Sequence, residues 1–450
     1  MIAELSAAVR DGRVHPTELV TEALRRIEAH DGGIGSVVAL RAEEALEEAA
    51  RSTREGPLAG IPFLVKDLAD CAGMRTTYGS KLFADAPPAS QDGVQAARLR
   101  AAGAIPIGKS NTPEFGWIGF TSNLVFGTTR NPWNLERSPG GSSGGSAAAL
   151  AAGLTPIATA SDGGGSVRIP ASMCGLVGYK PTIGGIGRDG SPRWMDFSTS
   201  GVLGHTVADV VTEAAVYLGP TPGDVLAVPG GAIDLTPARP HRAVLCRSLR
   251  GAVDPVIESA LLEAAATIEQ QGIVVEEIDN PIPDAFKGWF VTGMAEMAQS
   301  LADRRDRWDE LDPGLRAMLE YAESITLDAY IAARRERYAA CRTIDLLLGA
   351  DTVLITPTHN AQSWPAAGPW PSSVAGVKTP GVAVNTNDFN LTGHPAASVP
   401  IGRDDAGVPF GMQIVAPRWR DGLALGAAAA LEEAQPWALI ADGFEPFPVA

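Results

Sequence analysis

The chain has 450 residues, of which 45% are hydrophobic and 20% charged, a balance typical of a soluble globular protein with a large core. Its formal net charge is −16, which argues against nucleic acid or an anionic membrane as a partner, because both bind basic surfaces. No signal peptide and no apolar run of about 18 residues is evident, so we expect no membrane span. Four dispersed cysteines without metal-ligand spacing are typical of reduced thiols in a cytoplasmic protein.

Helical and strand patterns alternate along the chain. The run at 61–65 is continuously apolar, which suits a strand buried on both faces, and Lys66 stands at its C-terminal end. The other main patterns are helices at 3–12, 16–30, 41–52, 92–103, 208–219, 255–272, 331–349 and 423–434 and strands at 104–108, 154–160, 351–357, 396–402 and 409–417.

This alternation favours one α/β domain spanning residues 1–450. Residues 220–350 are mostly helical in pattern, and we interpret them as an elaboration of that domain that forms a lid or an interface. The pattern leaves a monomer and a homodimer both open.

Residues 140–168 hold two serine-bearing glycine clusters that flank an alanine-rich helix pattern and a short strand pattern. Such a density of glycine favours sharp turns or close approach of the backbone to a ligand. A helix of roughly nine residues leads about 14 Å away from Ser142, and the strand at 154–160 returns about 23 Å. We therefore expect the loops of Ser142 and Ser166 to meet at one edge of the fold.

Two short motifs suggest other chemistry. GAIPIGKS at 103–110 matches the P-loop pattern, but a helix precedes it and its four central residues are apolar and include a proline, so a buried strand is favoured over a nucleotide site. G-x-S-x-G occurs around Ser142 and Ser143, but a nucleophile elbow needs a strand before the serine, and a Ser-His-Asp esterase also needs a histidine. The six histidines are scattered along the chain.

A third possibility joins Lys66 to Ser142 and Ser166. A serine hydroxyl becomes a good nucleophile only when a neighbouring group takes its proton. A lysine amine can do so when it is neutral, which near neutral pH requires a pKa shift of about three units, or roughly 4 kcal/mol. Burial beside the apolar run at 61–65 can supply such a shift. A salt bridge from Lys66 to Asp67 or Asp70 is the alternative, and spacing alone does not choose between them.

The stretch GGSSGGSAAALAAGLTPIATASDGGGSVRIPASMCGLVGYKPT resembles the signature sequence of the amidase signature family almost position for position. The segments GIPFLVKD, LRAAGAIPIGKSNTPEFG, FGTTRNPWNLERSPGGSSGG and FNLTGHPAASVP resemble further segments of that family. The likeness covers most of the chain outside residues 220–350. It implies an α/β fold with a mixed central β-sheet between layers of α-helices.

The resemblance also implies a catalytic triad in which Ser166 is the nucleophile, Ser142 the bridging serine and Lys66 the base. The Gly141–Ser142 peptide bond would be cis, and no metal or organic cofactor would be needed. The backbone amides of Gly163, Gly164 and Gly165, with that of Ser166, would form the oxyanion hole, although the family more often has a larger residue at position 163. Asp162 and Arg168 would form a structural ion pair.

The expected reaction is hydrolysis of small hydrophobic or aryl amides, with carbamates and esters as variants that share the tetrahedral intermediate. Aromatic residues in three regions are candidates for an apolar substrate pocket: Tyr78, Trp117, Phe126, Trp194, Trp364 and Trp370. Two alternatives are the catalytic subunit of an aminoacyl-tRNA amidotransferase and an inactive relative that only binds ligands. The acidic charge weighs against the first, and the retained triad weighs against the second.

Overall fold

A computed structural model describes residues 1–188, 194 and 196–448 of the chain. The α-helices are α1 (Ile2–Arg10), α2 (Pro16–Ile34), α3 (Ala42–Ala50), α4 (Val94–Ala101), α5 (Gly144–Ala151), α6 (Arg168–Cys174), α7 (Val207–Tyr217), α8 (Pro255–Gln270), α9 (Phe286–Ser300), α10 (Pro313–Ala322), α11 (Leu327–Leu348), α12 (Asn387–Leu391) and α13 (Asp421–Ala434). Short 3₁₀ helices are η1 (Lys81–Phe83), η2 (Glu114–Gly116) and η3 (Ala302–Glu310).

The longer strands are β1 (Val37–Leu40), β2 (Pro62–Lys66), β3 (Ile105–Ser110), β7 (Ala160–Asp162), β8 (Val177–Lys180), β9 (Thr199–Gly204), β10 (Arg242–Leu245), β11 (Val274–Glu277), β12 (Thr352–Pro357), β15 (Ala396–Arg403) and β16 (Pro409–Val415). Two-residue strands are β4 (Ser122–Asn123), β5 (Gly127–Thr128), β6 (Ile157–Ala158), β13 (Ser373–Val374) and β14 (Val377–Lys378).

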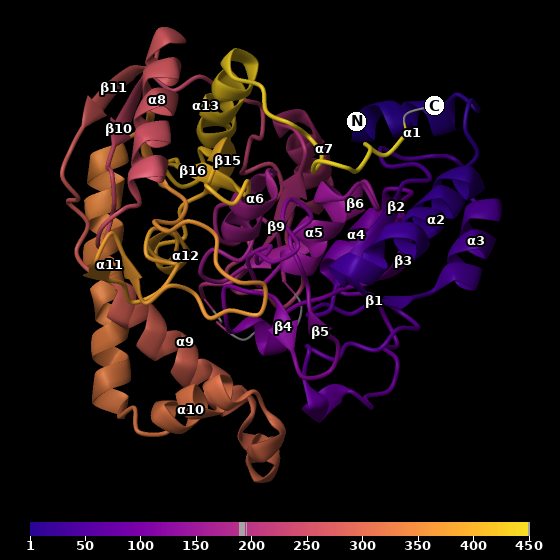
Figure 1. Ribbon diagram of the computed structural model, residues 1–450, viewed down its shortest axis with the longest axis horizontal. Helices are drawn as coiled ribbons and strands as arrows, with labels where there is room; N and C mark the ends of the chain where they lie inside the picture. Colours follow the sequence, from indigo (N-terminus) through magenta and orange to yellow (C-terminus); the bar gives the residue numbers. More distant parts are fainter. Residues whose placement is uncertain (189–193, 195, 449–450) are drawn as a thin grey trace.

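Two mixed sheets organise these elements. An eight-stranded sheet has the order β11-β10-β12-β16-β15-β8-β9-β7, and a four-stranded sheet has the order β1-β3-β2-β6. Helix α13 contacts both α7 and α8, all three helices contact strands of the large sheet, and α6 packs against β8, β15 and β16. Figure 1 shows the small sheet with α2 and α3 at one end of the molecule and β10, β11 and α8 at the other. The mixed central sheet with packed helices was expected, and this prediction is confirmed.

Local sequence explains several boundaries. Helix α2 begins with Pro16 at its first position, and His15 and Glu18 form a capping box that satisfies the first free amides. Strand β2 is buried along its whole length, as its apolar run predicted. None of the helices in residues 1–188, 194 and 196–448 is both long and apolar enough to span a bilayer.

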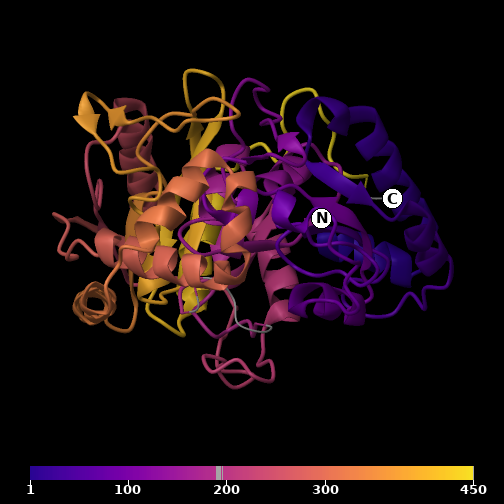
Figure 2. The same ribbon diagram turned by 90° about the horizontal axis from the view of Figure 1, so that it is seen from below.

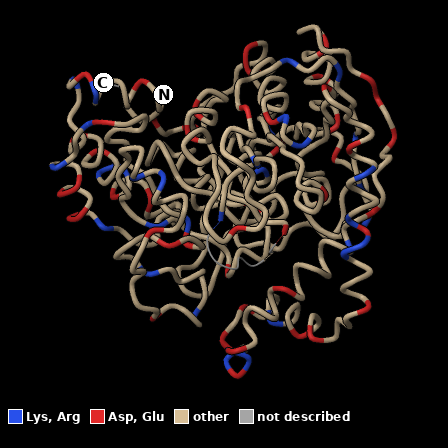
Figure 3. Tube along the Cα trace, turned by 180° about the vertical axis from the view of Figure 1, so that it is seen from behind, with Lys and Arg blue, Asp and Glu red and all other residues tan. Residues whose placement is uncertain are grey.

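Residues 220–350, expected to be mostly helical, contain α8 to α11 and also the strands β10 and β11. These strands pair in parallel and form one edge of the large sheet, so this interval contributes to the sheet as well as to its helical cover. Helices α9 and α10 lie on the underside of the molecule, in front of the C-terminal strands in the view from below (Figure 2). Charged residues of both signs are interspersed along the outer elements (Figure 3), as in the Arg247–Glu277 pair at 2.7 Å.

Candidate active site

The two serine loops meet at one edge of the small sheet. Strand β2 pairs in parallel with β6, so Lys66 at the end of β2 lies near the start of β7, which leads into the turn at 163–166. Helix α5 begins two residues after Ser142 and returns the chain toward β6. The N–H of Ser143 donates to the carbonyl of Ser166 at 3.2 Å, which ties the loops together. The peptide bond between Gly141 and Ser142 is cis, as the resemblance implied.

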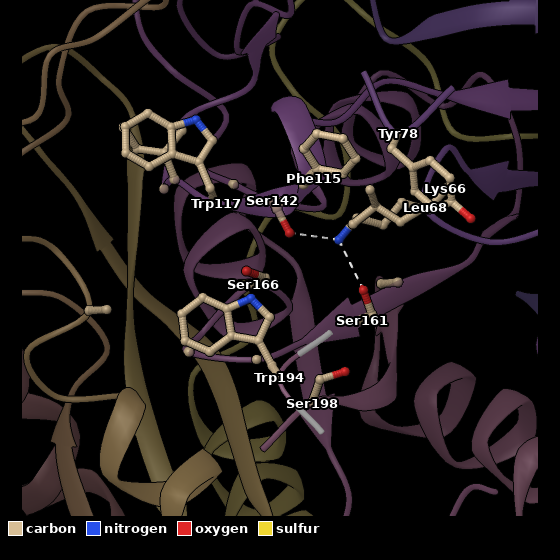
Figure 4. Close-up of a pocket in the computed structure, with 18 of the residues that line it drawn as sticks. Lys66, Leu68, Tyr78, Phe115, Trp117, Ser142, Ser161, Ser166, Trp194 and Ser198 are labelled. Carbon is tan, nitrogen blue, oxygen red and sulfur yellow. Dashed lines mark hydrogen bonds between the residues drawn. The ribbon is translucent and has the colours of Figure 1, made fainter. Parts of the chain in front are cut away.

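Lys66 is buried among serine hydroxyls. Its Nζ lies 2.8 Å from Ser142 Oγ and 3.1 Å from Ser161 Oγ (Figure 4). It also lies 2.8 Å from Ser143 Oγ. The side chain has only 2% of its surface exposed, and burial lowers the pKa of Lys66 to about 7. A substantial fraction of the amine is therefore neutral near neutral pH, as a proton acceptor requires.

The alternative interpretation of Lys66, a salt bridge to Asp67 or Asp70, does not describe this arrangement. The cation that pairs with Asp67 is Lys109, whose Nζ lies 3.4 Å from the carboxylate. Lys109 comes from the P-loop-like segment, which forms the buried strand β3 instead of a phosphate-binding loop. The contacts of Ser143 and Ser161 with Lys66 were not anticipated from the sequence.

The turn from Gly163 to Ser166 is shaped by Asp162. The Asp162 carboxylate accepts hydrogen bonds from the N–H of Gly165 at 2.7 Å and of Val167 at 3.1 Å. The Gly165 amide, expected in the oxyanion hole, is therefore directed at Asp162. Among the residues that the structure describes, the amides of Gly163, Gly164 and Ser166 have no hydrogen-bond partner. These three N–H groups are the ones available to bind an oxyanion.

Asp162 and Arg168 form a fully buried ion pair at 2.8 Å, at the positions where the resemblance implied one. Burial alone would raise the pKa of Asp162, but the Arg168 guanidinium holds this pKa well below its usual range. Arg168 also donates to the side chains of Gln413 at 2.6 Å and Asn390 at 2.6 Å. This network anchors the turn to β16 and α12, which supports a structural role for the pair.

A cavity of about 1110 Å³ opens over Lys66, Ser142 and Ser166. One part of its wall is polar, and the other is built mainly from aromatic and sulfur-containing side chains. The apolar wall includes Phe115, Trp117, Trp194, Phe286, Trp289, Phe290, Met294, Met318 and Trp370. A substrate with an apolar or aryl group would find extensive contact here.

Four of the six expected pocket aromatics line this cavity: Tyr78, Trp117, Trp194 and Trp370. The other two lie outside its lining. Trp364 is buried beneath the surface, its ring 5.7 Å from that of His359, and Phe126 is 38% exposed near the β4–β5 hairpin. Gly163 and Gly164 belong to the lining, whereas Gly165 does not.

The contribution of α9 and α10 to the cavity was missed at the level of the sequence. Phe286, Trp289 and Phe290 follow the i, i+3, i+4 spacing of one helix face, and this was the available signal. The same spacing is typical of any core-facing helix, so it could not indicate which part of the molecule the face covers.

The scattered histidines do not approach Ser142 or Ser166 in the part of the chain that the structure describes. Among the described residues that line the cavity there is no histidine, and His359 is buried elsewhere, 3.0 Å from Ser172 Oγ. The segment before Ser142 is a loop, as expected, so a nucleophile elbow is absent from this described part of the chain. In residues 1–188, 194 and 196–448, no three His, Cys, Asp or Glu side chains group as metal ligands.

Comparisons with known proteins identify the family of the chain. The model of the protein family described as Amidase matches residues 18–425. Acylamidase of Rhodococcus erythropolis is 34% identical over 456 residues, which cover 97% of this chain and 95% of the relative. A glutamyl-tRNA(Gln) amidotransferase subunit of Thermus thermophilus is also 34% identical, with 96% of each chain covered.

Among solved structures, a bacterial aryl acylamidase of the amidase signature family is similar along nearly its whole length. Its TM-score is 0.90 at 28% identity, with 97% of this chain and 96% of that chain covered. The family match, the full-length relatives and the shared fold all point to one family. The chain belongs to the amidase signature family and is a hydrolase of carbon–nitrogen bonds.

Proposed function

We propose that this enzyme hydrolyses the C–N bond of small hydrophobic or aryl amides through an acyl-enzyme on Ser166. The observation that carries this proposal is the buried Lys66 amine, 2.8 Å from Ser142 Oγ, in a cavity that Ser166 also lines. A lysine that contacts serine hydroxyls, and whose pKa burial has lowered to about 7, is suited to accept a proton from one of them.

In acylation, neutral Lys66 accepts the hydroxyl proton of Ser142, and Ser142 takes the proton of Ser166 as Ser166 Oγ attacks the amide carbonyl. The carbonyl oxygen becomes negatively charged and accepts hydrogen bonds from the free amides of the turn at 163–166. Ser142 then gives its proton to the nitrogen, which leaves as an amine when the C–N bond breaks. Lys66 returns its proton to Ser142, so the Lys66 amine is neutral again before deacylation.

In deacylation, a water molecule takes the place of the amine, and the same groups transfer protons again. Ser142, with Lys66 as its base, removes a proton from water as the oxygen attacks the acyl carbon. The tetrahedral intermediate collapses, the proton returns to Ser166, and the carboxylic acid is released. Because carbamates and esters react through the same intermediate, we include them as further substrates, as in a urethanase-like activity.

The apolar lining of the cavity supports small hydrophobic or aryl amides as the substrate class. Aromatic rings and methionines face the catalytic serines across a space large enough for an aryl group together with an acyl chain. The acylamidase and aryl acylamidase relatives point in the same direction. The likeness to a component of an amidotransferase favours a second candidate, transfer of ammonia from glutamine within a tRNA-dependent complex.

A substrate panel tests both candidates. We expect the purified chain alone to hydrolyse p-nitroanilides, with kcat/KM rising as the acyl group becomes larger and more apolar, and to cleave matched aryl carbamates and esters. Ser166→Ala is the control and should abolish every activity. Hydrolysis that is limited to glutamine and requires ATP, tRNA and partner proteins would instead support the amidotransferase.

A further inference from the structure

The peptide group between Gly163 and Gly164 is held by a side chain from outside the signature motif. The indole Nε1 of Trp289, on helix α9, donates a hydrogen bond to the carbonyl of Gly163 at 2.8 Å. This peptide bond is not one of the two cis bonds found among the described residues. In a trans peptide the carbonyl and the following N–H point to opposite sides. The N–H of Gly164 is therefore turned away from the indole.

Trp289 itself is tightly fixed. Its ring stacks on Trp194 with centroids 4.9 Å apart, and Trp194 packs in turn on Gly293, where an added Cβ would come within 2.0 Å of the Trp194 ring. A Cβ on Gly164 would lie 2.4 Å from Trp289 Cζ2, so the indole rests directly on the backbone of the turn. The position of Gly164 is thus set by a rigid stack of two rings against α9.

Neighbouring groups of the turn are fixed by other partners. Thr386 Oγ1 donates to the carbonyl of Gly164 at 2.6 Å, and Asp162 accepts from the N–H of Gly165. Two distant parts of the chain and the adjacent Asp162 therefore hold consecutive polar groups of the turn. In the described structure, its unpartnered amides are those of Gly163, Gly164 and Ser166.

We propose that Trp289 is a positioning residue of the oxyanion hole. Its N–H fixes the plane of the Gly163–Gly164 peptide so that the Gly164 amide faces the oxygen that becomes charged when Ser166 attacks. This role rests on the proposed function, because it needs Ser166 as the nucleophile. Through Trp289, helix α9 of the 220–350 interval contributes to the chemistry as well as to the wall of the cavity.

Removing the indole N–H tests this role. We expect Trp289→Phe to lower kcat on a p-nitroanilide about tenfold or more with little change in KM. Deleting one oxyanion donor typically lowers kcat by about 10²–10³-fold, and this substitution keeps the Gly164 N–H but removes the group that orients it. The rate of covalent labelling by a fluorophosphonate should fall in parallel. Replacing Trp289 by 3-benzothienylalanine, which keeps the ring shape but lacks the N–H, should reproduce the loss with an unchanged melting temperature.

Phe290→Leu is the matched control. Phe290 lies on the same helix and lines the same cavity, but its ring packs near that of Tyr321, away from the Trp194–Trp289 stack. Phe290→Leu should mainly raise KM, with little change in kcat. An unchanged kcat in the benzothienyl variant would overturn the role of Trp289. Labelling of the unmodified enzyme at a residue other than Ser166 would instead contradict the proposed function, so the two failures are distinguishable.

Discussion

The loops around Ser142 and Ser166 and the apolar wall of the cavity are held by different kinds of contact. The loops are buried and held by polar contacts: Lys66 to three serine hydroxyls, and Asp162 to Arg168 and to backbone amides. The wall formed by α9 and α10 is half-buried and held mainly by ring and methionine packing, as in the Trp194–Trp289 stack. A hydrogen bond from Trp289 to Gly163 joins the two regions.

This difference separates two tasks. Hydrogen bonds fix the direction of donors and acceptors, which the chemistry requires, whereas apolar packing defines only a shape and its size. Changes in the loops, or loss of the Trp289 N–H that joins the two regions, should therefore act on kcat. Changes elsewhere in the wall should act on KM and substrate choice. The following variants test this separation.

The largest effect is expected for Lys66→Met. The substitution removes the amine next to Ser142 and leaves an apolar chain of similar length in a buried position. We expect kcat to fall by about 10³-fold or more, since proton transfer by a positioned base contributes 10²–10⁴. Circular dichroism and the melting temperature should remain those of a folded protein. Substantial activity in a folded Lys66→Met enzyme would show that another group accepts the proton.

The glycine triplet should respond unequally to alanine. Gly165 has φ of +125°, and a Cβ there would meet Thr386 Oγ1 at 2.4 Å, so Gly165→Ala should distort the turn and reduce kcat about 100-fold. At Gly163 a Cβ would make ordinary contacts of 3.7 Å with Ser198 and 3.8 Å with Trp194. Gly163→Ala should therefore retain most of the activity. Equal losses at both positions would contradict the geometry of the turn.

The pH profile should follow the ionisation of Lys66. Burial lowers its pKa to about 7, and only the neutral amine accepts a proton, so activity should rise with pH through this value. For a single group of this pKa, kcat/KM at pH 6 should be about one tenth of that at pH 8. Initial rates of anilide hydrolysis across this range measure the effect.

Lys180 supplies the control for that profile. It is also fully buried, and burial together with the nearby Arg168 lowers its pKa to about 7, but its Nζ donates to the carbonyl of Pro181 and it does not line the cavity. Lys180→Met should leave the midpoint of the pH profile in place. Loss of this midpoint in Lys180→Met would show that the pH profile reports the ionisation of Lys180 and not of Lys66.

The smallest effect is expected in the wall. Met318, on α10, lines the cavity, and Met318→Ala should raise KM a few-fold for large aryl substrates with little effect on kcat, because it removes apolar contact area. Met297→Ala is the control, since Met297 is a buried core residue of α9 outside the cavity lining. Met297→Ala should lower the free energy of unfolding by about 2–5 kcal/mol without changing substrate preference.

The same separation explains what the sequence could predict. Local signals marked the strand that ends at Lys66, the loops of Ser142 and Ser166, and the buried strand at 104–108. These signals are continuous apolar runs, glycine clusters and a long family signature. The partners of Lys66 were harder to predict, because Ser143 and Ser161 look like ordinary residues of glycine-rich turns. Only the three-dimensional return of β7 brings Ser161 to the amine.

The apolar wall could not be located from the sequence, because an aromatic helix face has the same spacing whether it covers a core or a cavity. Trp364 and Phe126 illustrate this limit: both are aromatic residues in loops, yet one is buried beneath the surface and the other lies on it. The sequence did not indicate β10 and β11, because each has only four residues and lies between strong helical patterns. Each also pairs with a strand that is distant in sequence.

The most direct test of the account is the site of covalent modification. The enzyme is inactivated with a fluorophosphonate, digested, and the labelled peptide is mapped by tandem mass spectrometry. We predict a single adduct on Ser166 that forms faster as pH rises through about 7, in step with deprotonation of Lys66. An adduct on Ser142 or Ser143 would contradict the assignment of nucleophile and bridging serine on which the mechanism depends.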